Sequence, residues 1–134
     1  MIKKLLIACC VSLVSFNASA DGKYGCVMSV AGGFFWQGNS WQLKNFEKEN
    51  IIISVQRNGS ALKYRATSDD SDYEYTCTAS TKNRYLTCVD TLGSLLLFDE
   101  VGLKGGVAQL LGSIARSTED KDSLSVAEFT CQRF

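Results

Sequence analysis

The clearest pattern in the chain is the alternation of apolar and polar residues over positions 51–66, IIISVQRNGSALKYRA. Asn58-Gly59 in its middle is the strongest short signal for a β-hairpin turn, because both positions tolerate positive φ. Centring the turn there aligns apolar residues in three cross-strand pairs: Val55 with Leu62, Ile53 with Tyr64 and Ile51 with Ala66. The opposite face carries mostly polar pairs, so we expect one face in the core and one in solvent.

A second hairpin is predicted over residues 73–89. Residues 73–79 alternate, and residues 84–89 follow a polar turn at 81–83. A hairpin centred between Lys82 and Asn83 puts Cys77 directly opposite Cys88. With a four-residue loop this pair occupies a non-hydrogen-bonded site, where facing alpha carbons approach to about 4.5 Å. That separation is suitable for a disulfide.

The N-terminal part of the mature chain predicts a strand and then an aromatic hairpin. One face of the first strand carries apolar residues at alternate positions, at Tyr24, Cys26, Met28 and Val30. Gly32-Gly33 is expected to end this strand. Residues 34–41, FFWQGNSW, then form two aromatic arms around a Gln-Gly-Asn-Ser turn.

The region after the second hairpin is less regular. Residues 94–101, SLLLFDEV, are followed by a glycine-rich turn at 102–106. Residues 107–116 have apolar positions at the three, four and seven offsets of a helix. Gly112 in the middle and predicted strands on both sides favour another antiparallel strand instead.

The last segment changes parity along its length. Leu124 and Val126 share one parity, whereas Phe129 and Cys131 share the other. Because alternate residues of a strand point to opposite faces, both pairs can be inside only if an extra residue intervenes. We therefore expect a β-bulge between the two pairs in this strand.

These segments predict an all-β fold of about seven or eight short antiparallel strands. Their spacing of roughly 8 to 12 residues, with turn signals between them, is typical of a small barrel or a two-sheet sandwich. A disulfide between the first and last strands would favour the closed barrel, because closure brings the two sheet edges together. The two-sheet sandwich with the same connectivity is the alternative.

Residues 1–20 have the layout of a cleaved secretory signal. Lysines at positions 3 and 4 precede an uncharged apolar run, and Ala18-Ser19-Ala20 supplies the small residues of a cleavage site. The run is shorter than the roughly 20 residues that span a bilayer. We expect residues 21–134 to form a single periplasmic or secreted domain without a transmembrane span. Alternatively, Leu6-Ile7-Ala8-Cys9 resembles a lipoprotein box with Cys9 as a lipid anchor.

Four cysteines remain after cleavage, namely Cys26, Cys77, Cys88 and Cys131. An even number in a small exported chain indicates two disulfides. If Cys77 pairs with Cys88, Cys26 pairs with Cys131 by elimination and joins the first strand to the last. A zinc site is disfavoured, because the chain has neither a CxxC pair nor a histidine.

Charge and composition argue against several function classes. Without Lys3 and Lys4, 12 of the 14 basic residues remain against 14 acidic ones, with no basic stripe for nucleic acid. The lack of histidine removes Ser-His-Asp and Cys-His catalysis and the usual general base.

The acidic residues offer two weaker candidates. The pattern at Asp70, Asp72 and Glu74 only partly matches a calcium loop. A carboxylate hydrolase is the remaining enzyme class, and its candidate acids are Asp69, Asp70, Asp72, Glu74, Asp90, Asp99 and Glu100. We expect these acids to be solvated, and we expect no enzymatic activity, metal or cofactor.

The aromatic residues Phe34, Phe35, Trp36 and Trp41 have two interpretations. Aromatics near glycine in a β protein usually fill one end of the core. Alternatively they form a partner patch at a barrel mouth, because three consecutive residues of a strand cannot all point the same way.

The chain resembles a loose group of small, mostly uncharacterised exported bacterial β proteins with two disulfides. The resemblance rests on Tyr24-Gly25-Cys26, on the glycine-aromatic segment 33–36 and on the closing segments 122–126 and 129–131. In size, export and disulfides the chain is also similar to periplasmic lysozyme inhibitors of the small β-barrel type. These likenesses imply a fold and not a site.

Our leading functional hypothesis is a non-catalytic exported β domain that binds a macromolecular partner, as an inhibitor or an immunity-like protein. A rigid, disulfide-linked scaffold without histidine suits binding better than acid-base catalysis. The alternative is a small-ligand carrier, whose cavity would be lined by Ile53, Tyr64, Tyr75 and Leu97.

Overall fold

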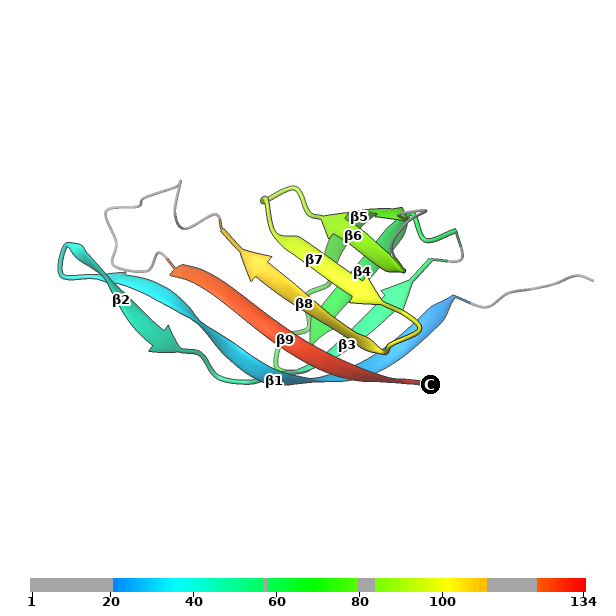
Figure 1. The fold of residues 1–134 in the computed structure, drawn as a ribbon, viewed down its shortest axis with the longest axis horizontal. Helices are drawn as coiled ribbons and strands as arrows, with labels where there is room; N and C mark the ends of the chain where they lie inside the picture. The colour runs from blue at the N-terminus through cyan, green and yellow to red at the C-terminus, as the bar shows by residue number, and fades with distance from the viewer. Residues whose placement is uncertain (1–20, 57, 80–83, 111–122) are drawn as a thin grey trace, which may run out of the picture.

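The computed structural model describes residues 21–56, 58–79, 84–110 and 123–134 of the protein. All regular structure in these ranges is β-strand, arranged as one antiparallel sheet (Figure 1). The strands are β1 (Gly22–Gln37), β2 (Ser40–Asn45), β3 (Asn50–Val55), β4 (Ala61–Ala66), β5 (Tyr73–Ala79), β6 (Tyr85–Val89), β7 (Leu95–Asp99), β8 (Lys104–Gln109) and β9 (Ser123–Arg133).

The sheet closes into a barrel of eight strands. Along the sheet the order is β2-β1-β3-β4-β5-β6-β7-β8-β9, and β1 also pairs with β9. The prediction of an all-β barrel is therefore confirmed, and the two-sheet alternative is excluded. Strand β2 lies outside the closed ring and pairs with the distal half of β1. Closure leaves no unpaired sheet edge in the ring itself.

Both predicted hairpin registers are confirmed. Strands β3 and β4 pair with Val55 opposite Leu62, and β5 and β6 pair with Cys77 opposite Cys88. In the β3–β4 turn, the Gly59 N–H donates a hydrogen bond to the Gln56 carbonyl at 2.8 Å. The predicted loop residues 81–83 lie outside the described residues.

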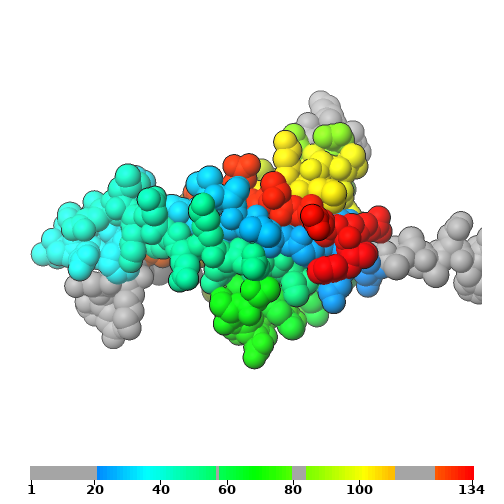
Figure 2. All heavy atoms as spheres, turned by 90° about the horizontal axis from the view of Figure 1, so that it is seen from below, coloured from blue at the N-terminus to red at the C-terminus, as the bar shows by residue number. Residues whose placement is uncertain are grey.

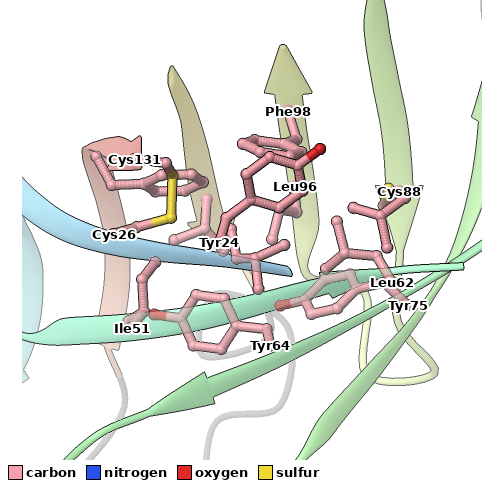
Figure 3. Close-up of a cluster of buried hydrophobic side chains, with 14 of the residues drawn as sticks. Tyr24, Cys26, Ile51, Leu62, Tyr64, Tyr75, Cys88, Leu96, Phe98 and Cys131 are labelled. Carbon is pink, nitrogen blue, oxygen red and sulfur yellow. A yellow bond between two sulfur atoms is a disulfide. The ribbon is translucent and has the colours of Figure 1, made fainter. Parts of the chain in front are cut away.

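The barrel interior is filled by alternate residues of its strands. Leu62, Leu96 and Phe98 are fully buried, and the Tyr24 ring packs edge-on against Phe98 with centroids 5.0 Å apart (Figure 3). Burying each side chain of this kind stabilises the fold by about 1.5–3 kcal/mol. The last residue of β7, Asp99, adds one buried carboxylate.

Two disulfides reinforce the barrel, with the predicted pairing. Cys26 and Cys131 lie directly opposite each other on β1 and β9, so their bond crosses the seam where the barrel closes. Cys77 and Cys88 are bonded across the β5–β6 hairpin, with alpha carbons 4.0 Å apart. One bond thus links distant parts of the chain, whereas the other stays within a hairpin.

The bulge predicted in the last strand is absent, and a bulge lies instead in β1. Met28 pairs with Phe129 and Val30 pairs with Glu128, which makes Ser29 the extra residue. The bulge reverses the parity of β1, so Val30 points outward and is 59% exposed. The expectation that Val30 and Val126 are both in the core is therefore wrong. Strand β9 keeps regular alternation past Val126, which is also 59% exposed.

Two predicted strand boundaries also need correction. Strand β1 does not end at Gly32-Gly33 but continues to Gln37, because β2 and β9 pair with it on both sides. The glycine-rich turn predicted at 102–106 is shorter, and β8 begins at Lys104. A Cβ at Gly105 would lie 2.6 Å from the Phe129 ring, so glycine here permits close packing and does not mark a turn. Residues 107–109 form a strand as predicted, and 111–116 lie outside the described residues.

Candidate binding surfaces

Beyond the bulge, three strands leave the barrel as an arm. We define the arm as residues 32–37 of β1, all of β2 and residues 123–126 of β9 (Figure 1). In the space-filling view the β1–β2 part of this arm projects from the body of the molecule (Figure 2). Its tip is a two-residue turn in which Gly38 and Asn39 have φ of 60° and 63°. These values fit the type I′ turn that matches the twist of a hairpin.

Cross-strand pairing sorts the side chains of the arm onto two faces. Phe34 lies opposite Leu43 on one side and opposite Leu124 on the other, and Trp36 lies opposite Trp41. Directly opposed residues in an antiparallel sheet project to the same face. One face, here called the outer face, therefore carries Phe34, Trp36, Trp41, Leu43, Leu124 and Val126. The two indole rings meet edge to face with centroids 5.2 Å apart.

The outer face is apolar and accessible. Leu43 is 79% exposed and Phe34 is 46% exposed, and the exposed Val30 and Val126 extend the apolar surface toward the barrel. Given their exposed fractions, these four residues together present an apolar surface on the order of 400 Å². A patch of that size is as large as the largest one found on typical monomeric proteins, and such patches are often binding sites.

Phe35 lies on the opposite face of the arm. It pairs with Gln42 and Ser123, and the Lys44 ammonium lies 4.9 Å from the centre of its ring. The predicted patch of four aromatics is therefore divided: Phe34, Trp36 and Trp41 share the outer face, and Phe35 does not. None of the four belongs to the buried core, so the interpretation that they fill one end of it is wrong.

Sequence reasoning missed three members of the outer face, namely Leu43, Leu124 and Val126. Leu43 carried a usable signal, because Trp41 and Leu43 alternate with polar residues in a single strand. Leu124 and Val126 of β9 carried no such signal, because the parity shift that turns them outward arises at Ser29 in another strand. An outward apolar residue of this kind is identified only once the pairing is known.

The interior residues expected to line a carrier cavity do not share one space. Ile53, Tyr64 and Tyr75 are buried in the core, whereas Leu97 points outward and is 42% exposed. Burial is the main cause that raises the pKa of Tyr75, to about 12. Tyr64 alone of these four lines a pocket at the barrel mouth. The predicted carrier lining is therefore not assembled.

The acidic residues considered for catalysis lie in separate ion pairs and turns. Asp72 accepts two hydrogen bonds from Arg65, at 2.6 and 2.9 Å, and Glu74 lies 3.3 Å from Lys63. Asp99 is instead buried, and accepts hydrogen bonds from the Val101 and Gly102 N–H groups and from Arg84. These contacts lower the pKa of Asp99, with the Gly102 N–H as the largest cause.

Two further candidate acids, Glu100 and Asp90, also have structural roles. Glu100 accepts a hydrogen bond of 2.7 Å from the Tyr24 hydroxyl, and Asp90 accepts hydrogen bonds from the Leu92 and Ser94 N–H groups. In the described ranges, no group of three or more Cys, Asp or Glu residues is placed to hold a metal ion. Neither do these ranges contain a helix of the length and hydropathy needed to cross a membrane.

No protein-family model matches the chain. Searches of curated protein sequences and of solved structures likewise give no match. What the arm binds must therefore be inferred from its own geometry and chemistry.

Proposed function

We propose that this protein is an exported, non-catalytic β domain that binds a macromolecular partner through the outer face of its arm. The mode of action is that of an inhibitor or immunity-like protein, which blocks its target by occupying a surface. The observation that carries the proposal is the apolar outer face, on which Leu43 is 79% exposed. Water-exposed apolar area of this extent is costly unless a partner covers it.

Three features support binding of a protein by this face. Its aromatic residues are of the kinds enriched at interface centres, and Trp36 and Trp41 support each other edge to face. Its three hydrogen-bonded strands hold these side chains in a fixed arrangement, which lowers the entropy lost on binding. The arm's one charged residue among the described ranges, Lys44, lies on the other face.

Two observations support export and a stable binding scaffold. Two disulfides are typical of proteins in oxidising compartments. The barrel beneath the arm has a filled core and is joined across its seam by Cys26–Cys131. A rigid body that presents an apolar arm suits binding without catalysis.

The test is site-specific photo-crosslinking in the cells that produce the protein. A photoreactive residue at Leu43 is expected to give one discrete adduct with another protein, identified by mass spectrometry. Leu97 is the matched control, because it is also an outward leucine in a strand, on the barrel wall formed by β7. In a second variant the photoreactive residue is placed at position 34 and Leu43→Ser is added. This substitution should abolish the adduct while leaving the unfolding midpoint unchanged within error.

Three outcomes would contradict the proposal. In one, positions 43 and 97 give the same set of adducts, which would mean that crosslinking reports exposure and not a specific interface. In another, position 43 gives no adduct under conditions in which both disulfides are formed. An adduct with a second copy of the chain would also contradict it, because the arm would then be a dimer contact.

A further inference from the structure

A pocket lies where the inner side of the arm meets the mouth of the barrel. Its volume is about 310 Å³, which is at the lower end of the range for small-molecule sites. Apolar residues from three barrel strands line part of it: Met28, Ala31, Val107 and Ala127. Of these, Met28, Val107 and Ala127 belong to the buried core, so this part of the lining is held in place.

Tyr64 supplies a hydroxyl to this pocket. The residue is 8% exposed, and its ring packs against Tyr73 and Tyr75. Its hydroxyl makes no hydrogen bond with any residue in the described ranges. In the core view the hydroxyl points toward Ile51, away from Tyr75 (Figure 3). No buried side-chain oxygen in the described ranges lacks a hydrogen-bond partner, so this hydroxyl is within reach of solvent and can bond to a ligand in the pocket.

Two carboxylates stand at the same pocket. Glu47 and Glu49 line it from the segment that connects β2 to β3. Among the described residues neither forms an ion pair, since the three ion pairs there involve other acids. Glu49 is half-buried and accepts one hydrogen bond, of 2.8 Å, from the Ser68 hydroxyl. The charged residues that line the pocket are thus both negative, and a positive group is the natural complement.

We propose that this pocket binds a small organic amine. Its ammonium is held by Glu47 and Glu49, its remaining N–H donates to the Tyr64 hydroxyl, and its short apolar body rests on Met28 and Val107. A primary ammonium has three donors, which matches these three oxygen-bearing groups. Charge-assisted hydrogen bonds of this kind are about twice as strong as neutral ones. The inference does not rest on partner binding by the outer face, because residues of the inner side form most of the pocket lining. Val126 is the one outer-face residue that also lines it.

The binding test uses three probes of similar size that differ in charge. Phenethylamine, 2-phenylethanol and 3-phenylpropionate are titrated separately into the purified, disulfide-bonded protein, followed by NMR chemical shifts. The amine is expected to saturate and to shift the amides of Ala31, Val107 and Ala127. The neutral alcohol is expected to bind at least about tenfold more weakly, and the acid not at all. Equal binding of the alcohol and the amine would overturn the proposal, as would shifts located elsewhere.

Substitutions at the pocket provide the second test. Joint Glu47→Gln and Glu49→Gln should weaken amine binding by at least about tenfold, because the ammonium loses both opposite charges. Tyr64→Phe keeps the ring and removes only the hydroxyl, and should weaken binding several-fold, by roughly one hydrogen bond. Glu74→Gln is the matched control, because this exposed carboxylate lies on β5 away from the pocket. An equal loss with Glu74→Gln would show a general charge effect and would sink the site.

Discussion

The barrel and the arm share two strands, β1 and β9, yet similar side chains are buried in the barrel and exposed on the arm. Phe129 of β9 is fully buried in the barrel, whereas Phe34 of β1 is 46% exposed on the arm. The change occurs at Ser29, where the bulge reverses the parity of β1. Up to that point the ring of strands encloses one face of β1. Past it, β2 replaces β3 along the same edge, and no strand in the described ranges covers the outer face.

The comparison teaches that closure of the ring decides burial, and residue type does not. The apolar residues of the barrel contribute stability because the ring removes them from water. Those of the arm are equally apolar but remain accessible, so selection for folding alone does not explain them. If this division is correct, changes in the barrel should alter stability, and changes in the arm should alter local structure or binding.

The largest contrast is expected between the two disulfides. In the chain-entropy description, a disulfide stabilises by limiting the unfolded state, and more so for longer loops. Cys26–Cys131 spans 105 residues of sequence and Cys77–Cys88 spans 11. We expect joint Cys26→Ala and Cys131→Ala to lower the free energy of unfolding by about 4–5 kcal/mol. Joint Cys77→Ala and Cys88→Ala should lower it by about 3 kcal/mol.

Urea unfolding of the native chain and of the two double variants measures this difference. The remaining disulfide must be shown intact by mass spectrometry in each variant. Equal losses for the two double variants would indicate that the seam bond is not the principal constraint on the barrel. A larger loss of stability on removal of the hairpin disulfide would contradict the expected order of the two bonds, because the hairpin bond closes only a short, local loop.

The second contrast compares a barrel glycine with an arm glycine. A Cβ at Gly105 would collide with the Leu97 carbonyl and the buried Phe129 ring. Gly105→Ala should therefore lower the free energy of unfolding by about 3 kcal/mol, the upper part of the usual range for overpacking. A Cβ at Gly33 would collide with the backbone of Leu124 on the neighbouring strand. Gly33→Ala should separate β9 from β1 in the arm while changing the global stability by less than about 1 kcal/mol.

Hydrogen exchange distinguishes local from global effects in these variants. Gly33→Ala should speed exchange of the amides in residues 123–126 and leave those of the barrel core unchanged. Gly32→Ala is the matched control, because a Cβ there would lie 3.5 Å from the nearest atom, the Lys44 carbonyl oxygen. If Gly33→Ala destabilises the whole protein as much as Gly105→Ala, arm and barrel unfold as one unit and the distinction fails.

The parts that sequence reasoning predicted correctly depend on neighbouring residues. The β3–β4 and β5–β6 registers follow from alternation and turn chemistry within one short segment. The Cys26–Cys131 bond followed once the hairpin pair was assigned, and it indicated closure of the barrel. Local pattern and covalent pairing thus carried most of the fold.

The arm was predicted only in part because its shape depends on distant pairing. Residues 28–30, Met-Ser-Val, look like uninterrupted alternation, and nothing in them marks Ser29 as a bulge. The bulge becomes visible only from the register with β9, about 100 positions away along the chain. The same distance hid Leu124 and Val126 from the predicted patch. Sequence alone therefore found the aromatic hairpin but not the third strand that completes its outer face.

The smallest and sharpest contrast concerns acid. The arm contains no carboxylate, whereas the barrel holds the buried Asp99, whose pKa is lowered from its ordinary value of 3.8 chiefly by the Gly102 N–H. Because the unfolded state binds the proton first as pH falls, the stability from Asp99 is fully present above pH 4. It should be lost progressively below that, as pH falls through the lowered pKa of the folded state. Melting temperatures between pH 6 and 2 should therefore fall less steeply at low pH in Asp99→Asn, which cannot titrate, than in the native chain.

Amide chemical shifts test the same contrast residue by residue. Followed over the same pH range, they should move around residues 99–102 and stay constant in residues 32–37 of the arm. A melting profile for Asp99→Asn that parallels the native one would contradict the role of this carboxylate, and acid-induced shifts throughout the arm would show that barrel and arm respond together.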